Sequence, residues 1–235
     1  MVALSDVAAV VTDIEGTTTP ISFVKDTLFP YARAHLPQFL AKHARDADVA
    51  AAVERVASIA NIPAVNLSQI ASTLETWMDE DRKDEPLKTL QGLIWQDGYL
   101  HGELRSAIYP DAAEVLASWA QCGLCLAVYS SGSVLAQKLL FGSAPSGDMA
   151  KLFEAFFDTE VGAKREASSY RAITRRLGLA AKNVLFLSDI AEELDAAAEA
   201  GLNTIQVVRP ADGTVPSTRH ALVSSFSEIV LNGKG

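Results

Sequence analysis

Short apolar runs alternate with amphipathic segments at the start of the chain and again in its second half. Residues 7–12 form an apolar, β-branched run that leads into Asp13, which predicts a buried strand followed by a turn. Beyond Pro110, similar runs alternate with segments of helical periodicity. Strands are predicted at 124–129, 153–157, 184–187 and 204–208, and helices at 111–121, 133–141, 166–177 and 190–200. This alternation predicts a parallel sheet with right-handed connections.

The stretch from residue 21 to about residue 105 follows a different pattern. Its apolar residues recur at helical spacing, and further helices are predicted to begin at Leu67 and Leu87. The charged residues 79–86 between these helices predict a solvated loop. The sequence therefore predicts an α/β fold in which two separate segments build one parallel sheet core and a helical insert interrupts them. The core is assigned to residues 1–20 and 110–235, and the helical insert to residues 21–109.

Composition narrows the classes of function. The chain is 49% apolar and carries a net charge of −9, which argues against nucleic-acid binding as its main role. The first residues lack a basic segment and are interrupted by Ser5 and Asp6, so no signal peptide is predicted. No apolar run reaches the length of a membrane span. We therefore expect a cytoplasmic protein that binds neither membrane nor nucleic acid, and we expect a monomer.

The two cysteines, Cys122 and Cys125, are three positions apart. This spacing suits a redox pair or half of a zinc site. No second pair of cysteines or histidines follows at zinc-ligand spacing, and Cys125 falls inside a predicted strand. Inert packing of a buried thiol is therefore the favoured interpretation for Cys125.

Two carboxylates stand at the end of the first predicted strand. Asp13 and Glu15 are two residues apart, and Gly16 suits the turn that follows. Ligands of open α/β sheets bind outside the carboxyl ends of the strands. The pair therefore predicts either a Mg²⁺ site or a nucleophile with an acid/base partner. A side-chain-capped turn that merely closes the strand is the structural alternative.

Polar side chains follow two further strands and one loop. Ser130 and Ser131 come after a strand and before a helix, which suits a phosphate cradle or an ordinary helix cap. Asp189 ends another buried strand and could share a metal with Asp13, or cap the next helix. Lys164 precedes a helix in a charged loop, where a lysine is usually a solvated charge.

Taken together, these motifs resemble those of the haloacid dehalogenase (HAD) superfamily of phosphatases. Residues 13–18, Asp-Ile-Glu-Gly-Thr-Thr, resemble its first motif, and residues 13–24 resemble its enolase-phosphatase E1 family of methionine salvage. The resemblance covers nearly the full chain and includes residues 94–99, 138–142 and 207–210. It implies a HAD-like, Rossmannoid parallel sheet core with an inserted helical cap. The chain departs from most such phosphatases by having Glu15 in place of the second aspartate, and Asp189-Ile190 in place of two aspartates.

The resemblance also implies roles for the candidate residues. Asp13 is implied as the nucleophile and Glu15 as an acid/base group, with Lys164 neutralising charge in the transition state. Ser130 and Ser131 are implied to hold the substrate phosphate. One Mg²⁺ per subunit is implied, with Asp13, Asp189 and a side-chain or backbone group of Glu15 as ligands.

Other choices stay open at this point. A further acid could be Glu192 or Glu193, with a marginal preference for Glu193, and the neighbouring Arg165 is expected to point elsewhere. Residues of the insert that could face substrate are Phe23, Trp95, Tyr99, Glu103 and Tyr109.

The implied reaction converts 2,3-diketo-5-methylthiopentyl-1-phosphate, through its enol-phosphate, to 1,2-dihydroxy-3-keto-5-methylthiopentene and phosphate. The alternatives are another Mg²⁺-dependent phosphatase of this superfamily acting on a sugar or glycolate phosphate, a dehalogenase, or a non-catalytic phospholigand-binding module.

Overall fold

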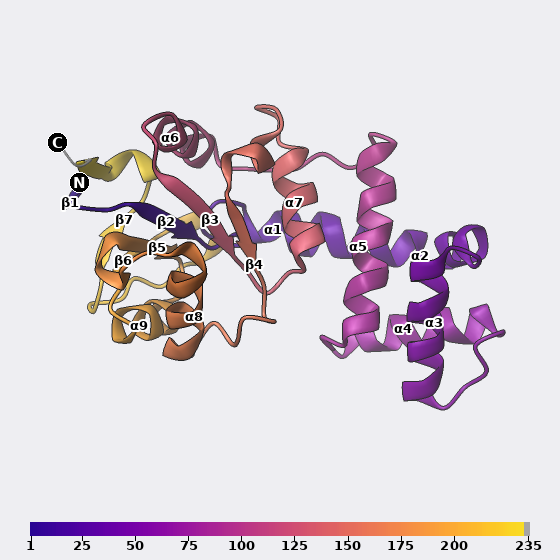
Figure 1. Cartoon of the computed structure of the whole chain (residues 1–235). Helices are drawn as coiled ribbons and strands as arrows, with labels where there is room; N and C mark the ends of the chain where they lie inside the picture. Colours follow the sequence, from indigo (N-terminus) through magenta and orange to yellow (C-terminus); the bar gives the residue numbers. More distant parts are fainter. Residues whose placement is uncertain (233–235) are drawn as a thin grey trace. The chain divides into compact units, whose positions relative to one another are not determined.

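A parallel sheet forms the centre of the larger part of the chain (Figure 1). The computed structural model describes residues 1–232, and within them six strands have the order β4-β3-β2-β5-β6-β7. The strands are β2 (Ala9–Thr12), β3 (Cys125–Tyr129), β4 (Ala155–Phe157), β5 (Val184–Ser188), β6 (Asn203–Val207) and β7 (Ala221–Val223). All neighbouring pairs are parallel, and β2 lies between β3 and β5. Asp13 and Asp189 therefore follow adjacent strands at the same edge of the sheet.

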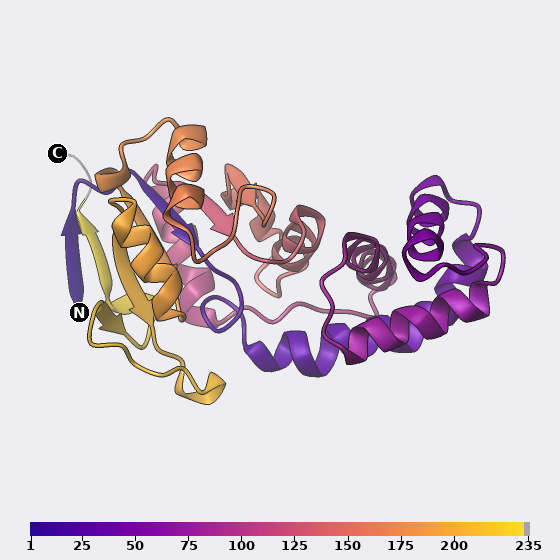
Figure 2. The ribbon, with the colours of Figure 1, turned by 90° about the horizontal axis from the view of Figure 1, so that it is seen from below.

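Helices cover both faces of this sheet. Figures 1 and 2 show α8 and α9 on one face and α6 on the opposite face. The helices of this part are α1 (Ile21–Phe23), α6 (Pro110–Gln121), α7 (Val134–Gly142), α8 (Ala167–Leu177) and α9 (Ala191–Glu199). Short 3₁₀ turns lie at η2 (Met149–Leu152), η3 (Ala181–Asn183), η4 (Pro210–Asp212) and η5 (Phe226–Glu228). Because helices cover both faces, strands β2 and β5 are buried along their whole length and consist almost entirely of apolar residues.

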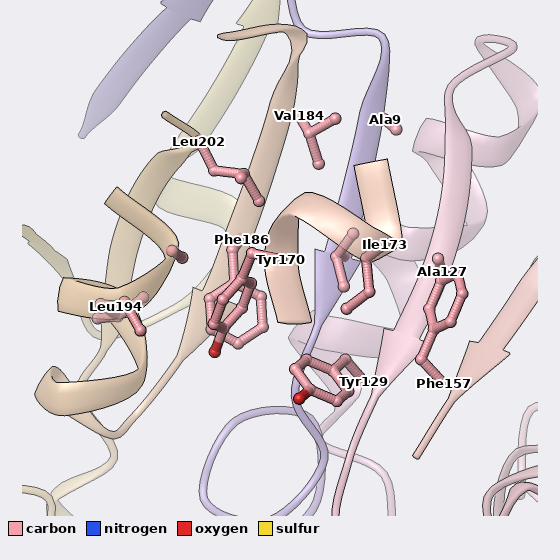
Figure 3. Close-up of a cluster of buried hydrophobic side chains, with 13 residues drawn as sticks. Ala9, Ala127, Tyr129, Phe157, Tyr170, Ile173, Val184, Phe186, Leu194 and Leu202 are labelled. Carbon is pink, nitrogen blue, oxygen red and sulfur yellow. The ribbon is translucent and has the colours of Figure 1, made fainter. Parts of the chain in front are cut away.

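An aromatic cluster fills the space between the sheet and helices α8 and α9 (Figure 3). Tyr129 on β3, Tyr170 on α8 and Phe186 on β5 are fully buried. The Tyr170 ring meets the Tyr129 ring edge-on at 5.5 Å and the Phe186 ring at 5.0 Å between centroids. Aromatic groups packed in this way fix the position of α8 against the sheet.

The two ends of the described chain pair with each other. Strand β1 (Val2–Ser5) lies parallel to β8 (Ile229–Asn232), and the two form a separate two-stranded sheet. Neither strand, nor β7, is predicted from the sequence. β1 and β7 are short and partly exposed, so their sequences lack the continuous apolar run that identifies β2 and β5.

A second compact unit, residues 24–104, consists of helices. It contains η1 (Val24–Leu28), α2 (Phe29–His43), α3 (Ala47–Ala60), α4 (Leu67–Asp79) and α5 (Glu85–Leu100), of which η1 is a π-helical segment. Helix α5 packs against α2 and α3, and the indole N–H of Trp95 donates to the carbonyl of Leu28 at 2.8 Å. The apolar faces of these helices form a core of their own.

The compact units have boundaries that differ slightly from those expected. Contacts group residues 1–23 with residues 105–235 and leave residues 24–104 as the other unit, whereas the sequence suggests an insert at 21–109. The difference arises because both linking segments contact the sheet unit. Tyr109 donates its backbone N–H to Thr18 and its hydroxyl to Asp212, and the N–H of Ile21 also donates to Asp212. None of the helices in residues 1–232 is both long and apolar enough to cross a membrane.

Candidate active site

The turn after β2 presents Asp13 at the edge of the sheet. The Asp13 N–H still bonds to the carbonyl of Leu187 on β5 at 2.9 Å, so its position continues the strand ladder. The chain then reverses, because the N–H groups of residues 17–19 all donate to the carbonyl of Ile14. Gly16 adopts a φ of +70°, a conformation that glycine takes without steric cost. Backbone hydrogen bonds before and after Asp13 thereby fix its position, and the residue is almost fully buried.

Asp189 lies against this turn from the neighbouring strand. Its N–H donates to the Thr17 hydroxyl at 3.0 Å, which ties the end of β5 to the turn. A Cβ on Gly16 would stand 2.5 Å from Oδ2 of Asp189, so the two segments approach as closely as a glycine allows. Oδ1 of Asp189 is buried without a hydrogen-bond partner. A buried carboxylate oxygen without a partner is costly unless another group binds it.

Lys164 bridges two carboxylates at the same edge. Its Nζ lies 2.6 Å from Oδ1 of Asp13 and 2.7 Å from Oε2 of Glu193, and only 11% of its side chain is exposed. The Ser188 hydroxyl donates to Oε2 of Glu193 at 3.0 Å and lies 3.5 Å from Oδ2 of Asp13. Loop, strand and helix thus contribute charged groups to one contiguous network.

Burial and mutual repulsion shift the pKa values in this network. The pKa of Asp189 is raised to about 7, mainly by burial and then by the charges of Asp13 and Glu193. The pKa of Glu193 is also raised to about 7, mainly by burial and then by Asp13, although Lys164 opposes the shift. The pKa of Lys164 is raised because the attraction of Asp13 and Glu193 exceeds the effect of its burial. The acidic groups outnumber the cation, so the site favours a further positive charge.

The loop after β3 carries the two candidate phosphate ligands. Ser130 is buried, and its hydroxyl accepts the N–H of Gly132 at 3.3 Å, whereas Ser131 is exposed. Ser133 caps helix α7 by accepting the N–H of Ala136. Capping by Ser133 leaves Ser131 outside the first turn of α7, at the end of the strand beside β2.

The remaining candidate site residues differ in their burial and in their distance from the charged network. Glu15 lies half-buried in the turn after β2, where its backbone bridges to Thr19. Glu193 is buried beside Lys164, while Glu192 is exposed and lines a cavity next to Asp189. Arg165 is exposed. The geometry therefore brings Asp13, Lys164, Glu193 and Asp189 into one network and leaves Glu192 and Arg165 outside it.

The residues of the insert that could face substrate have varied surroundings. Phe23 and Trp95 are buried. Glu103 is exposed and accepts the Tyr31 hydroxyl at 2.6 Å. Tyr109 belongs to the sheet unit, where it donates to Asp212, and Tyr99 is half-buried. The burial of Phe23 and Trp95 indicates that both side chains pack in the protein interior.

The sequence interpretation assigned no role to three residues that support the network. Ser188 links Glu193 to the neighbourhood of Asp13, and Thr17 receives the N–H of Asp189. Arg209, 7% exposed, donates to the carbonyl of Thr17 and forms a two-point ion pair with Asp111. A serine immediately before the strand-end aspartate is a local signal, but the partners of Arg209 are almost two hundred and almost one hundred positions away.

The donor set at this edge fits a magnesium ion. Oxygen atoms are the ligands that Mg²⁺ prefers, and it usually keeps several waters instead of filling its shell with side chains. Within residues 1–232 no group of three or more histidine, cysteine, aspartate or glutamate side chains is arranged to hold a metal. A metal here would be held by the carboxylates of Asp13 and Asp189 with backbone or water oxygens. The partnerless Oδ1 of Asp189 and the raised pKa of its carboxyl fit such a cation.

Comparison with known proteins agrees with the parallel α/β fold. The chain belongs to the haloacid dehalogenase-like hydrolase family, whose model matches residues 7–201. The solved structure of CbbY from Rhodobacter sphaeroides with phosphate shares the fold, with a TM-score of 0.57 and 17% identity over 94% of this chain and 96% of that chain.

Relatives with higher sequence identity place the chain in a narrower group within this hydrolase family. Enolase-phosphatase E1 of Yersinia enterocolitica is 50% identical over 97% of this chain and 98% of its own length. The solved UTR4 protein of Saccharomyces cerevisiae is 37% identical, with a TM-score of 0.80 over 94% of this chain and 98% of that chain. Within the hydrolase family, the chain groups with the enolase-phosphatase E1 proteins.

Proposed function

We propose that this chain is an enolase-phosphatase of methionine salvage. Its substrate is 2,3-diketo-5-methylthiopentyl-1-phosphate, which it enolises and then dephosphorylates to 1,2-dihydroxy-3-keto-5-methylthiopentene. The observation that carries the proposal is the Asp13 carboxylate, held 2.6 Å from the Lys164 ammonium beside the Asp189 carboxylate. The enolase-phosphatase E1 relatives, which are 50% identical over nearly the whole chain, support the choice of substrate.

Phosphoryl transfer in this proposal is carried by the chain's own residues. An Asp13 oxygen attacks phosphorus as the bond to the substrate oxygen breaks, and Glu15 gives that oxygen a proton. Water, deprotonated by Glu15, then attacks the aspartyl-phosphate, which releases inorganic phosphate and restores the Asp13 carboxylate. Lys164 stabilises the negative charge on the transferring group, and Ser130 and Ser131 orient the phosphate oxygens.

One Mg²⁺ per subunit completes the proposed site. Asp13 and Asp189 would hold the ion by their carboxylates, and Glu15 by its side chain or backbone. When bound, the ion neutralises phosphate charge and polarises a substrate carbonyl. Residues 24–104 are proposed as the cap that gives specificity. A monomeric state and a cytoplasmic location stay predictions from the sequence.

The test uses a variant that separates the two half-reactions. Asp13→Asn keeps the shape of the side chain and removes the anionic nucleophile, so phosphate release should fall below detection at saturating Mg²⁺. Enolisation does not need a covalent bond to Asp13, so absorbance of the conjugated enol-phosphate should rise without matching phosphate. Asp6→Asn is the control, because Asp6 is exposed at a positive φ that asparagine tolerates.

Two results would contradict the proposal. Phosphate release by Asp13→Asn at the wild-type rate would remove Asp13 as the nucleophile. If wild-type protein leaves the diketone phosphate unchanged and hydrolyses a sugar phosphate or phosphoglycolate instead, the chain is a different phosphatase of the family.

A further inference from the structure

The loop that carries Lys164 is held in place by hydrogen bonds that its carbonyl groups accept from side chains. Residues 158–166 connect β4 to α8 without regular structure, yet three successive carbonyls in this loop each accept a side-chain hydroxyl. The bonds run from Tyr129 to Gly162 at 3.0 Å, from Ser169 to Ala163 at 2.8 Å, and from Tyr170 to Lys164 at 2.7 Å. Side chains of β3 and α8 therefore fix the path of this loop through hydrogen bonds.

The two tyrosine donors have little freedom to move. Both are fully buried, and their rings pack edge-on at 5.5 Å, with Phe186 5.0 Å from the Tyr170 ring. Figure 3 shows both phenol oxygens pointing toward the carboxyl end of β2, where Asp13 lies. Because a buried ring cannot turn without displacing its neighbours, each hydroxyl defines a fixed point for the carbonyl that it binds.

The loop is also fitted closely to α8. Gly162 adopts a φ of +136°, and a Cβ at this position would overlap the Ser169 hydroxyl. Any other residue at position 162 would push the loop away from the donors. The Lys164 backbone thus has a defined position, from which its side chain reaches Asp13 at 2.6 Å and Glu193 at 2.7 Å.

We propose that Tyr170 is a positioning residue for Lys164, and that Tyr129 and Ser169 assist it by fixing the two preceding carbonyls. In the described structure each of these hydroxyls donates to a carbonyl of the loop. They act by fixing the backbone from which the ammonium extends, so that its position is set before substrate binds. The catalytic part of this inference rests on the proposed function, whereas the structural part concerns Lys164 alone.

The first test removes the donor and keeps the ring. Tyr170→Phe should lower kcat by about 10- to 100-fold, the scale of a small misplacement of a catalytic group, and should change KM little. Thr174→Val is the matched control, because it removes another buried hydroxyl of α8, one that bonds to the carbonyl of Arg171 within the same helix. The control should keep kcat within about twofold of wild type.

A double-mutant cycle separates positioning from general damage. In the Lys164→Ala background the ammonium is absent, so Tyr170→Phe should cause no further fall in kcat. An equal fall in both backgrounds would overturn the inference. If Tyr170→Phe does not fold, Ser169→Ala enters the same cycle, with a smaller expected fall.

A second measurement needs no turnover. In protein labelled with ¹⁵N-lysine, the buried Lys164 ammonium should give a resonance with slow proton exchange, identified by its loss in Lys164→Ala. Tyr170→Phe should broaden or shift this resonance, and Thr174→Val should leave it unchanged. An unchanged resonance in Tyr170→Phe would overturn the inference. The expected change, together with no turnover of the diketone phosphate by wild type, would reject the proposed function and keep the inference.

Discussion

Lys164 shows how strongly the electrostatic effect of one charged residue depends on its surroundings. In the sequence it is a lysine in a charged loop, next to Arg165, and nothing local distinguishes the two. In the structure Lys164 is nearly buried between two carboxylates while Arg165 is exposed. A buried cation beside Asp13, the proposed nucleophile, acts in a low local dielectric, where its charge stabilises a developing anion far more than it would in water.

Removing that charge should be costly. Lys164→Ala should lower turnover of the phosphorylated substrate by roughly 10²-fold or more, as the loss of a transition-state charge contact does. Arg165→Ala should stay within about twofold of wild type, because exposed side chains contribute little. Steady-state phosphate release measures both variants, with circular dichroism as a check of folding. The opposite ranking would mean that Arg165 is the catalytic cation.

Among the elements, the turn after β2 determines how close Asp189 can come to Asp13. Gly16 contributes in two separable ways, since it has a positive φ and leaves no side chain in the way of Asp189. Many turns need only the first property. Here the second property lets the Asp189 carboxylate lie directly against the turn that follows β2.

Gly16→Ala should therefore lose both properties. The left-handed backbone should cost about 1–2 kcal/mol of stability. The added methyl group, 2.5 Å from Oδ2 of Asp189, should also weaken Mg²⁺ binding at least about tenfold, by displacing a ligand. Gly178→Ala is the control, because its φ is +68° and a Cβ there meets nothing within 4 Å.

Thermal unfolding and titration calorimetry with Mg²⁺ distinguish the two effects. Both variants should have a lower Tm, and only Gly16→Ala should have weaker Mg²⁺ binding. Equal Mg²⁺ affinity in the two variants would show that the close approach of Gly16 to Asp189 is not needed for the metal.

The elements of the sheet differ in how well the sequence predicts them. The runs of β2 and β5 are buried on both faces, so apolar character alone identifies them, and the predicted ends lie within two residues of the observed ones. The strands β1 and β7 are short and partly exposed, and β8 pairs with β1 at the other end of the described chain, so local pattern does not identify them. In the same way, Asp13 and Asp189 could be proposed because each follows a buried apolar strand, whereas the partners of Ser188 and Arg209 could not be assigned from local sequence.

At the scale of the whole molecule, the raised pKa values of the buried acids should make folding stability depend on pH, and a bound metal ion should change that dependence. The pKa of Asp189 is raised to about 7 from an ordinary value of 3.8, so the folded chain holds this proton more tightly than the unfolded chain does. Folding stability should therefore be highest below the unfolded pKa and should fall as pH rises through about 7. The raised pKa of Glu193 acts in the same direction. Asp111, whose pKa is lowered, contributes a constant amount in this range.

In EDTA, the Tm should accordingly fall between pH 5.5 and pH 8. Mg²⁺ binds the ionised carboxylates and should raise the Tm more at pH 8 than at pH 5.5. Calorimetry of wild type and Asp189→Asn checks this, because asparagine removes one titrating group and should flatten the pH dependence. A metal-induced rise in Tm that is equal at both pH values would contradict the assignment.

The insertion of residues 24–104 between β2 and β3 also has a consequence during protein synthesis. Strand β2 is made before the insert, but both of its partners, β3 and β5, follow only after it. At typical elongation rates this delay is on the order of ten seconds. The helical unit is contiguous and can form in that interval, while an apolar strand with unpaired edges waits on the ribosome. Among the described strands β1 waits longest, because its partner β8 follows all the others in the chain. The nascent chain therefore exposes an apolar strand before its partners exist, which should favour binding by chaperones that recognise extended apolar segments.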